Sequence, residues 1–191
     1  MLLDSFPDRQ KLMILPDATT ESVIIKRVAK STTRFNVNYT FDATLQDDTL
    51  VSNGDLVTIE GEKYFVVARR NSYLSKSAQL YKSNCSVTIV RLVKQYIGTS
   101  WTGKWTEQVL HENVPALYQD ITGKMQQFDS GLLSTSTRKF ILPKLEGIQL
   151  LDRVKMLTSG GIENGQIDVL NTTEYEGLYS TQTQPDKRVV V

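Results

Sequence analysis

Cysteine and histidine are almost missing from this sequence. Among its 191 residues, Cys85 is the only cysteine and His111 is the only histidine. A single cysteine cannot form an internal disulfide, and a reducing assembly compartment is therefore permitted. A zinc site of the usual Cys/His type lacks ligands, and any nucleophile–histidine–acid triad would have to use His111. These two counts exclude several common catalytic and metal-binding chemistries.

Charge of one sign and long apolar runs are also missing. The chain holds 22 Lys and Arg against 21 Asp and Glu, a formal net charge of +1. Sequence-independent binding to nucleic acid would need a clear basic excess or stripe. No apolar run approaches the roughly 20 residues that span a bilayer. Asp4 stands where a secretion signal would carry positive charge. We therefore expect neither secretion nor a membrane partner.

Several residues could carry chemistry in principle, but each has a structural interpretation that we favour. Paired acids in polar turns are usually hydrated, and no nucleophile-elbow motif surrounds the histidine. The glycine-rich turn near the C-terminus is not followed by a phosphate-binding lysine motif. The cysteine begins a β-branched run and is expected to be a small, inert core residue. These candidates are Asp47, Asp48, Glu60, Glu62, Cys85, His111 and Gly160. We expect no catalytic residue, no metal and no cofactor.

The strongest local pattern is a predicted hairpin between Gly54 and Arg70. A strand over Leu56 to Ile59 and a strand over Tyr64 to Ala68 flank a turn at Gly61. Glycine supplies the positive φ of a tight turn, and the flanking β-branched and aromatic residues suit a pleated surface. The second strand is apolar at five successive positions, so we expect it to be buried on both faces.

A similar pattern returns near the C-terminus. Residues Asp152 to Leu157 lead through Ser159-Gly160-Gly161 to a returning strand over Gln166 to Leu170. Each copy opens with an aspartate, turns at glycine and returns as a β strand. The repetition predicts two small β modules, each built around one such hairpin.

The whole chain is predicted to be all-β: two small antiparallel β-barrel or sandwich modules with extended termini. Further short strands alternate with polar turns, for instance over Ser86 to Val93 and Lys139 to Leu142. The predicted division is an N-terminal arm 1–20, a first module 21–97, a linker 98–106, a second module 107–180 and a C-terminal tail 181–191.

The predicted linker and termini hold the candidate subunit contacts. Two tryptophans lie among glycine, serine and threonine in the linker, and exposed tryptophans often mark partner surfaces. Apolar terminal segments could add a strand to a neighbour's sheet edge. Deleting residues 1–16 or 181–191 is therefore expected to weaken assembly more than folding. The candidates are Leu2, Leu3, Phe6, Tyr73, Leu74, Trp101, Trp105, Val189, Val190 and Val191.

Three stretches together resemble the neck proteins of tailed bacteriophages. Gly54-Asp55-Leu56-Val57 followed by Gly61 to Val67 resembles a hairpin of that group, and the segment 80–89 follows it as a similar segment does there. The Leu151-Asp152-Arg153-Val154 hairpin is similar to the element found in head-closure (stopper) and head–tail connector proteins, which are small β-barrels. The resemblance covers residues 50–95 and, more weakly, 108–175.

This resemblance implies a non-enzymatic virion protein, assembled in the host cytoplasm. It would form a homo-oligomeric ring of about six or twelve copies between the portal or adaptor and the tail, with DNA passing through unread. Two alternatives stay open. One is a tail-completion or terminator protein of the same virion. The other is an intracellular β-barrel module that binds a peptide or single-stranded nucleic acid, which a basic, aromatic face would favour.

Overall fold

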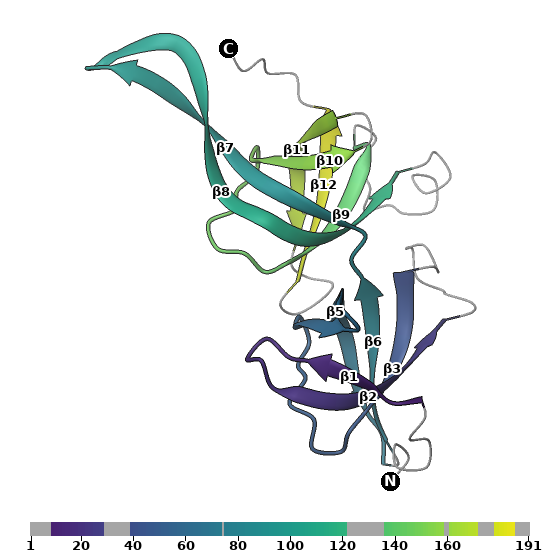
Figure 1. Ribbon diagram of the computed structural model, residues 1–191. Helices are drawn as coiled ribbons and strands as arrows, with labels where there is room; N and C mark the ends of the chain where they lie inside the picture. Colours follow the sequence, from purple (N-terminus) through teal and green to yellow (C-terminus); the bar gives the residue numbers. More distant parts are fainter. Residues whose placement is uncertain are drawn as a thin grey trace. The chain divides into compact units, whose positions relative to one another are not determined.

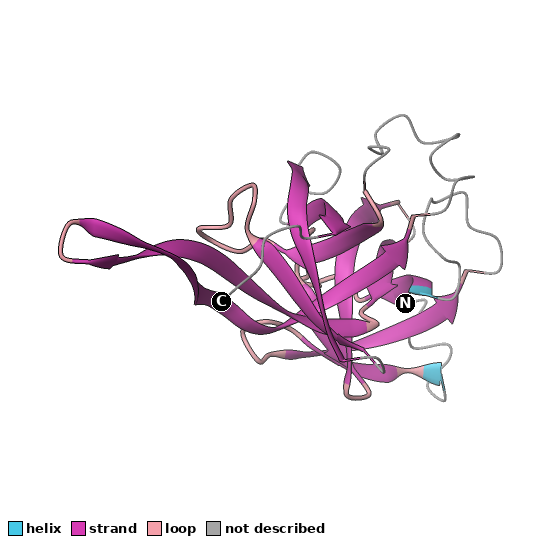
Figure 2. Ribbon diagram, turned by 90° about the horizontal axis from the view of Figure 1, so that it is seen from above, coloured by secondary structure: helices cyan, strands magenta, loops and turns pink. Residues whose placement is uncertain are grey.

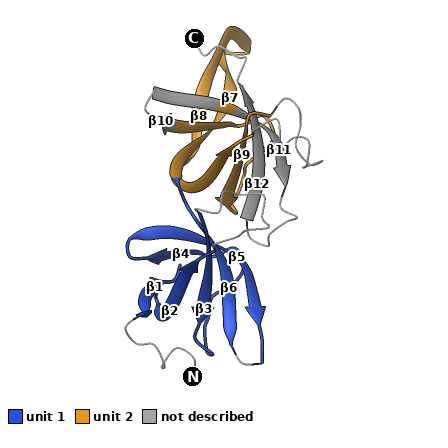
Figure 3. Ribbon diagram, turned by 90° about the vertical axis from the view of Figure 1, so that its right-hand side faces the viewer, with its two compact units in different colours: residues 1–84, 172–179 blue, residues 85–171, 180–191 orange. Residues whose placement is uncertain are grey.

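The computed structural model describes residues 9–28, 39–73, 75–121, 136–158, 161–171 and 178–185. The chain forms two compact units, one made of residues 1–84 and 172–179 and the other of residues 85–171 and 180–191 (Figure 3). Nearly all regular structure in the described residues is β strand, and helix is limited to short turns (Figure 2). The all-β prediction is confirmed.

Unit 1 is a closed barrel whose strands follow the order β1-β2-β3-β6-β5-β4. Pairing between β1 and β4 closes it, with Met13 opposite Ile59 and Ile14 opposite Thr58. Closure removes the free strand edges that short strands would otherwise expose. The strands are β1 (Lys11–Ile14), β2 (Thr20–Arg27), β3 (Thr40–Leu45), β4 (Leu56–Ile59), β5 (Glu62–Asn71) and β6 (Lys76–Lys82) (Figure 1).

Unit 2 is a second closed barrel, ordered β7-β8-β9-β12-β11-β10. Its closing pair is β7 with β10, with Val87 opposite Met156 and Ile89 opposite Val154. Counted from the first strand of each unit, both barrels have the same strand order. The strands are β7 (Cys85–Ile97), β8 (Ser100–Asp120), β9 (Arg138–Pro143), β10 (Arg153–Thr158), β11 (Gly161–Asn171) and β12 (Leu178–Pro185).

The two barrels also share a hydrogen-bonded corner before their fourth strand. In unit 1 the Asp55 carboxylate accepts a hydrogen bond from the Ser52 amide at 2.7 Å, and the Asp55 carbonyl accepts one from the Val66 amide at 2.9 Å. In unit 2 Asp152 accepts from the Gln149 amide at 2.7 Å and from the Ile167 amide at 2.8 Å. The aspartate that opens each hairpin in the sequence therefore fixes how that hairpin starts.

Backbone irregularities recur at matching positions. Gly54 has φ of 87° and Leu151 has φ of 72°, each immediately before the corner aspartate. A register shift follows Val66 in the β5–β6 pair, and another follows Ile167 in the β11–β12 pair. Such a bulge bends a strand and increases its twist, which a small barrel requires to close. The repeated hairpin seen in the sequence is therefore a repeated structural element.

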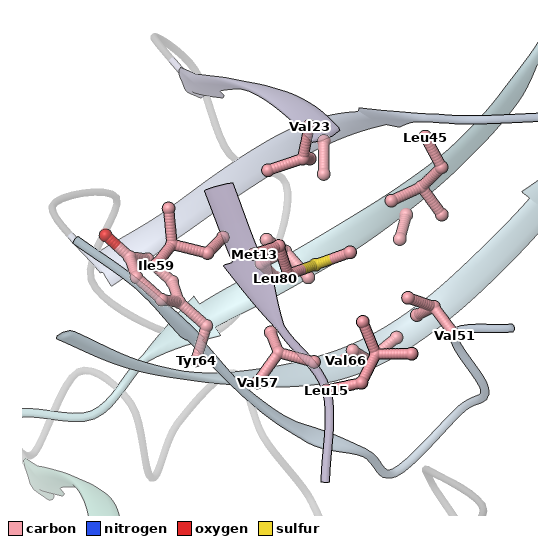
Figure 4. Close-up of a cluster of buried hydrophobic side chains, with 12 residues drawn as sticks. Met13, Leu15, Val23, Leu45, Val51, Val57, Ile59, Tyr64, Val66 and Leu80 are labelled. Carbon is pink, nitrogen blue, oxygen red and sulfur yellow. The ribbon is translucent and has the colours of Figure 1, made fainter. Parts of the chain in front are cut away.

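Each barrel is filled by side chains from the inward faces of its strands. In unit 1 the core includes Met13, Val23, Val66 and Leu80, all with no exposed surface, and Figure 4 shows the labelled side chains gathered around Met13 and Leu80. Residues 64–67 are all buried, as predicted for a strand covered on both faces, whereas Ala68, the last residue of the predicted run, is partly exposed. Burial also raises the pKa of Tyr64 above its usual value.

The division between the units lies earlier than the predicted linker. The units separate between Asn84 and Cys85, whereas residues 98–106 lie at the far end of the β7–β8 hairpin. The predicted terminal segments also overlap barrel strands, because β1 lies within 1–20 and β12 extends to Pro185. Deleting residues 1–16 would therefore remove β1, and deleting residues 181–191 would remove most of β12. The ends 1–8 and 186–191 lie outside the described residues.

We expect Leu80→Ala to lower the free energy of unfolding of unit 1 by about 2–5 kcal/mol, because it leaves a cavity in a fully buried site. The matched control is Leu12→Ala, at a leucine that is 58% exposed on β1, where the expected change is within about 0.5 kcal/mol. Urea titration followed by circular dichroism measures both. Equal midpoints for the two variants would contradict the assignment of Leu80 to the core.

Leu151 adopts a left-handed backbone conformation that costs a non-glycine residue about 1–2 kcal/mol. Leu151→Gly should therefore stabilise unit 2 by about 0.5–1 kcal/mol, after the larger entropy of an unfolded glycine is subtracted. Gly54→Ala, the reverse change at the matching site, should destabilise unit 1. Thermal unfolding tests both, and a loss of stability in Leu151→Gly would mean that the leucine side chain stabilises the corner.

Candidate interaction site on the second unit

Among the described strands, the two barrels differ most in the length of their first hairpin. In unit 1 the β1–β2 pair ends at Ile14 opposite Thr20. In unit 2 the β7–β8 pair continues from Cys85 opposite Ala116 out to Ile97 opposite Ser100. Residues 91–108, here called the arm, project from the barrel of unit 2 as a twisted two-stranded ribbon (Figures 1 and 2). A projecting ribbon has no barrel core to cover its side chains.

The arm exposes apolar side chains. Ile97 is 75% exposed, and Tyr96 and Trp101 are each about half exposed. A single exposed apolar residue is ordinary, but a contiguous group on one projecting element usually marks a binding surface. Aromatic residues are also enriched among the few residues that dominate binding energy at protein interfaces.

A bulge of two extra residues in β8 holds the two tryptophans together. Tyr96 pairs with Trp101 and Lys94 pairs with Trp105, so β8 carries two more residues than β7 over this interval. Gly103 takes φ of 80° inside the bulge. The indole rings consequently meet edge to face with centroids 6.2 Å apart, although four sequence positions separate them.

Polar contacts hold this aromatic pair in place. The Thr102 hydroxyl donates to the Gln95 carbonyl at 3.0 Å, across the bulge. The Lys94 ammonium lies 5.1 Å from the Trp101 ring centroid and 5.8 Å from that of Trp105. Each cation–π contact contributes on the order of 0.5–1 kcal/mol at an exposed site. The arm therefore presents an organised cluster of Lys94, Trp101 and Trp105.

The base of the arm is tied to the corner of unit 2. The Arg91 guanidinium donates to both carboxylate oxygens of Asp152, at 2.7 and 2.8 Å, and to the Gly147 carbonyl at 2.6 Å. Hydrogen bonding to Asp152 raises the pKa of Arg91. On the opposite strand, Glu107 pairs with Lys155 and with the buried Arg153. Bidentate arginine–carboxylate pairs fix geometry as well as charge, so the arm leaves the barrel in a defined direction.

The predicted contact residues are spread over the chain. The tryptophans of the arm come together, and Tyr73 is fully exposed in the β5–β6 loop of unit 1. Lys94, Tyr96 and Ile97 were not predicted as contact residues, because their only signal in the sequence is their position beside the tryptophan segment. The remaining candidates lie outside the described residues, namely Leu2, Leu3, Phe6, Leu74, Val189, Val190 and Val191.

Two residues considered for catalysis, His111 and Cys85, are placed by a backbone contact and by burial. His111 Nε2 lies 2.8 Å from the Glu146 carbonyl, which ties β8 to the corner loop. Burial raises the pKa of the Cys85 thiol to about 12, which leaves very little of the nucleophilic thiolate at neutral pH. The described residues contain no group of three His, Cys, Asp or Glu side chains placed to hold a metal ion. Within the same residues, no helix has the length and apolar character needed to cross a membrane.

Comparisons with protein-family models, curated proteins and solved structures find no match to this chain.

Replacing Gly103 with Ala should disturb the bulge, because the added side chain is disfavoured at φ of 80° although nothing occupies the space around it. We expect the near-ultraviolet circular dichroism of the paired tryptophans to weaken while the far-ultraviolet spectrum is kept. Thr99→Ala, at an exposed residue of the hairpin turn, is the control. An unchanged near-ultraviolet spectrum in Gly103→Ala would mean that the bulge does not set the tryptophan geometry.

Proposed function

We propose that this chain is a non-enzymatic structural subunit of a tailed-bacteriophage neck. Copies of it form a ring between the portal or adaptor and the tail, and DNA passes through the ring without sequence readout. The resemblance of its two hairpins to those of head-closure and connector proteins motivates this proposal. Its two small closed barrels fit the architecture expected of that group.

The observation that carries the proposal is the organised, exposed aromatic cluster of the arm. A structural subunit works by making repeated contacts, and such contacts need rigid apolar anchors on accessible elements. Trp101, Trp105 and Lys94 are held by the β8 bulge, and the arm is held by the ion pairs at its base. An arm fixed in this way loses little conformational entropy when it meets a partner.

The direct test is incorporation into virions. The double variant Trp101→Ala and Trp105→Ala should fold normally, because both residues lie outside the barrel, and should be strongly depleted from purified particles. Gln108→Ala, at an exposed polar residue of the same arm, should be incorporated like the parent. Quantitative mass spectrometry of the particles measures all three proteins. Parental incorporation of the tryptophan double variant would contradict the proposal that the arm makes an assembly contact.

One observation favours the alternative of a single-stranded nucleic-acid binding module. The arm combines two lysines with three aromatic residues and has no acid between Leu92 and Thr106. Aromatic and cationic side chains together can stack bases and hold phosphates. Saturable quenching of tryptophan fluorescence by an oligonucleotide, weakened by salt and lost with the arm tryptophans, would support this alternative. We favour the protein contact because Lys94 lies over one face of each indole ring, which leaves less ring surface for stacked bases.

A further inference from the structure

The repeated corner gives an internal comparison between the units. The segment Thr49-Leu50 of unit 1 corresponds in sequence to Glu146-Gly147 of unit 2. The first segment lies three residues before Ser52-Asn53, and the second lies three residues before Gln149-Leu150. In unit 2 the arm hairpin binds this segment, because His111 contacts the Glu146 carbonyl and Arg91 contacts the Gly147 carbonyl. This kind of corner is thus already a docking surface for residues of the β7–β8 hairpin.

The corner of unit 1 is fixed but keeps an exposed apolar side chain. Glu21 accepts hydrogen bonds from the Leu50 amide, at 2.8 Å, and from the Thr49 hydroxyl. Leu50 is nevertheless 66% exposed. Unit 1 has no long arm of its own, since β1 ends at Ile14. Within the described residues of unit 1, no hairpin covers Leu50, so the corner presents an exposed leucine whose backbone amide is fixed by Glu21.

Charge distinguishes the two surfaces. Asp47 and Asp48 are exposed beside Leu50. Within the described residues neither carboxylate has an ion pair. The Lys76 ammonium contacts the Asp47 backbone carbonyl and not its carboxylate. The arm carries Lys94 and Lys104 and no acid from Leu92 to Thr106. The acidic segment around Leu50 on unit 1 and the basic, aromatic arm on unit 2 are therefore complementary in charge. Such complementarity selects partners and speeds their association.

We propose that the arm of one copy docks on unit 1 of a second copy, at residues 46–50, which lead into the aspartate corner and are included in it here. This inference rests on the proposed ring and specifies its subunit contact. The arm tryptophans and Ile97 pack on Leu50, while Lys104 pairs with Asp47 or Asp48. The arm and the corner are different surfaces of the chain, so each copy offers one surface to one neighbour and the other surface to the next, which makes a heterologous contact possible. A heterologous contact repeats head to tail and closes into a ring when the rotation allows.

Disulfide cross-linking between two single-cysteine proteins tests this contact. In a Cys85→Ser background, one full-length protein carries Thr99→Cys at the arm turn and the other carries Asp48→Cys at the corner. Mixed under mild oxidation, they should form the mixed dimer well beyond its random share. Glu62→Cys replaces Asp48→Cys in the control, because Glu62 lies at the opposite end of the β4–β5 hairpin from the corner. A random yield, or a yield equal to the control, overturns the inference.

Charge reversal gives a second readout that does not depend on the cysteines. Lys104→Asp alone and Asp48→Lys alone should each weaken self-association about tenfold, and a mixture of the two variants should restore much of it. Sedimentation velocity measures the association. If neither variant changes it, the ion pair is absent and the inference fails. If oligonucleotide binding rather than self-association tracks Lys104, the arm serves nucleic acid and the inference also fails.

The outcomes for this contact and for the neck function are separable. Random cross-linking together with normal incorporation into virions rejects the docking inference and leaves the neck proposal standing. Specific cross-linking in a protein that enters no particle supports the contact and rejects the neck proposal.

Discussion

The aspartate corner is the constraint on which both barrels depend. Asp55 and Asp152 each bind a backbone amide three residues earlier through the side chain and a returning-strand amide through the carbonyl. This double anchor fixes where β4 and β10 begin, and those strands close the barrels by pairing with β1 and β7. An opened barrel would expose its strand edges and its core together. The corner therefore links a local turn to the integrity of each whole unit.

In unit 2 the same aspartate also determines the position of the arm. Asp152 accepts the Arg91 guanidinium, so the carboxylate that sets the start of β10 also orients the β7–β8 hairpin. In unit 1 the corner carbonyl of Val51 is bound instead by Arg69 from β5, and the first hairpin is short. One repeated barrel thus appears in two versions, a plain one and one that carries a rigid projecting element. We regard this divergence as the functional specialisation of the chain.

The sequence predicted the hairpins well because their signals are local: an opening aspartate, a glycine turn and β-branched strands. It placed the unit boundary in the wrong segment, because Gly98, Gly103 and the intervening Ser and Thr give the arm the composition of a linker. In the structure Gly98 belongs to the hairpin turn and Gly103 to the bulge, and both take positive φ. Residues 100–106 pair with β7 across this turn, but their glycine, serine and threonine residues gave no strand signal. Residues 181–185 are polar, and they form a strand through pairing with neighbouring strands of the barrel, among them β11.

Removal of the arm tests most directly the claim that the chain is two self-sufficient barrels, one carrying a dedicated contact element. Leu92 and Glu107 face each other across the hairpin, so an Asn-Gly turn can replace residues 93–106 and preserve the register. We predict that this variant keeps the far-ultraviolet spectrum and the melting temperature of the parent and loses self-association and incorporation into particles. Loss of folding would contradict the independence of the barrel, and parental association of the folded variant would contradict the role given to the arm.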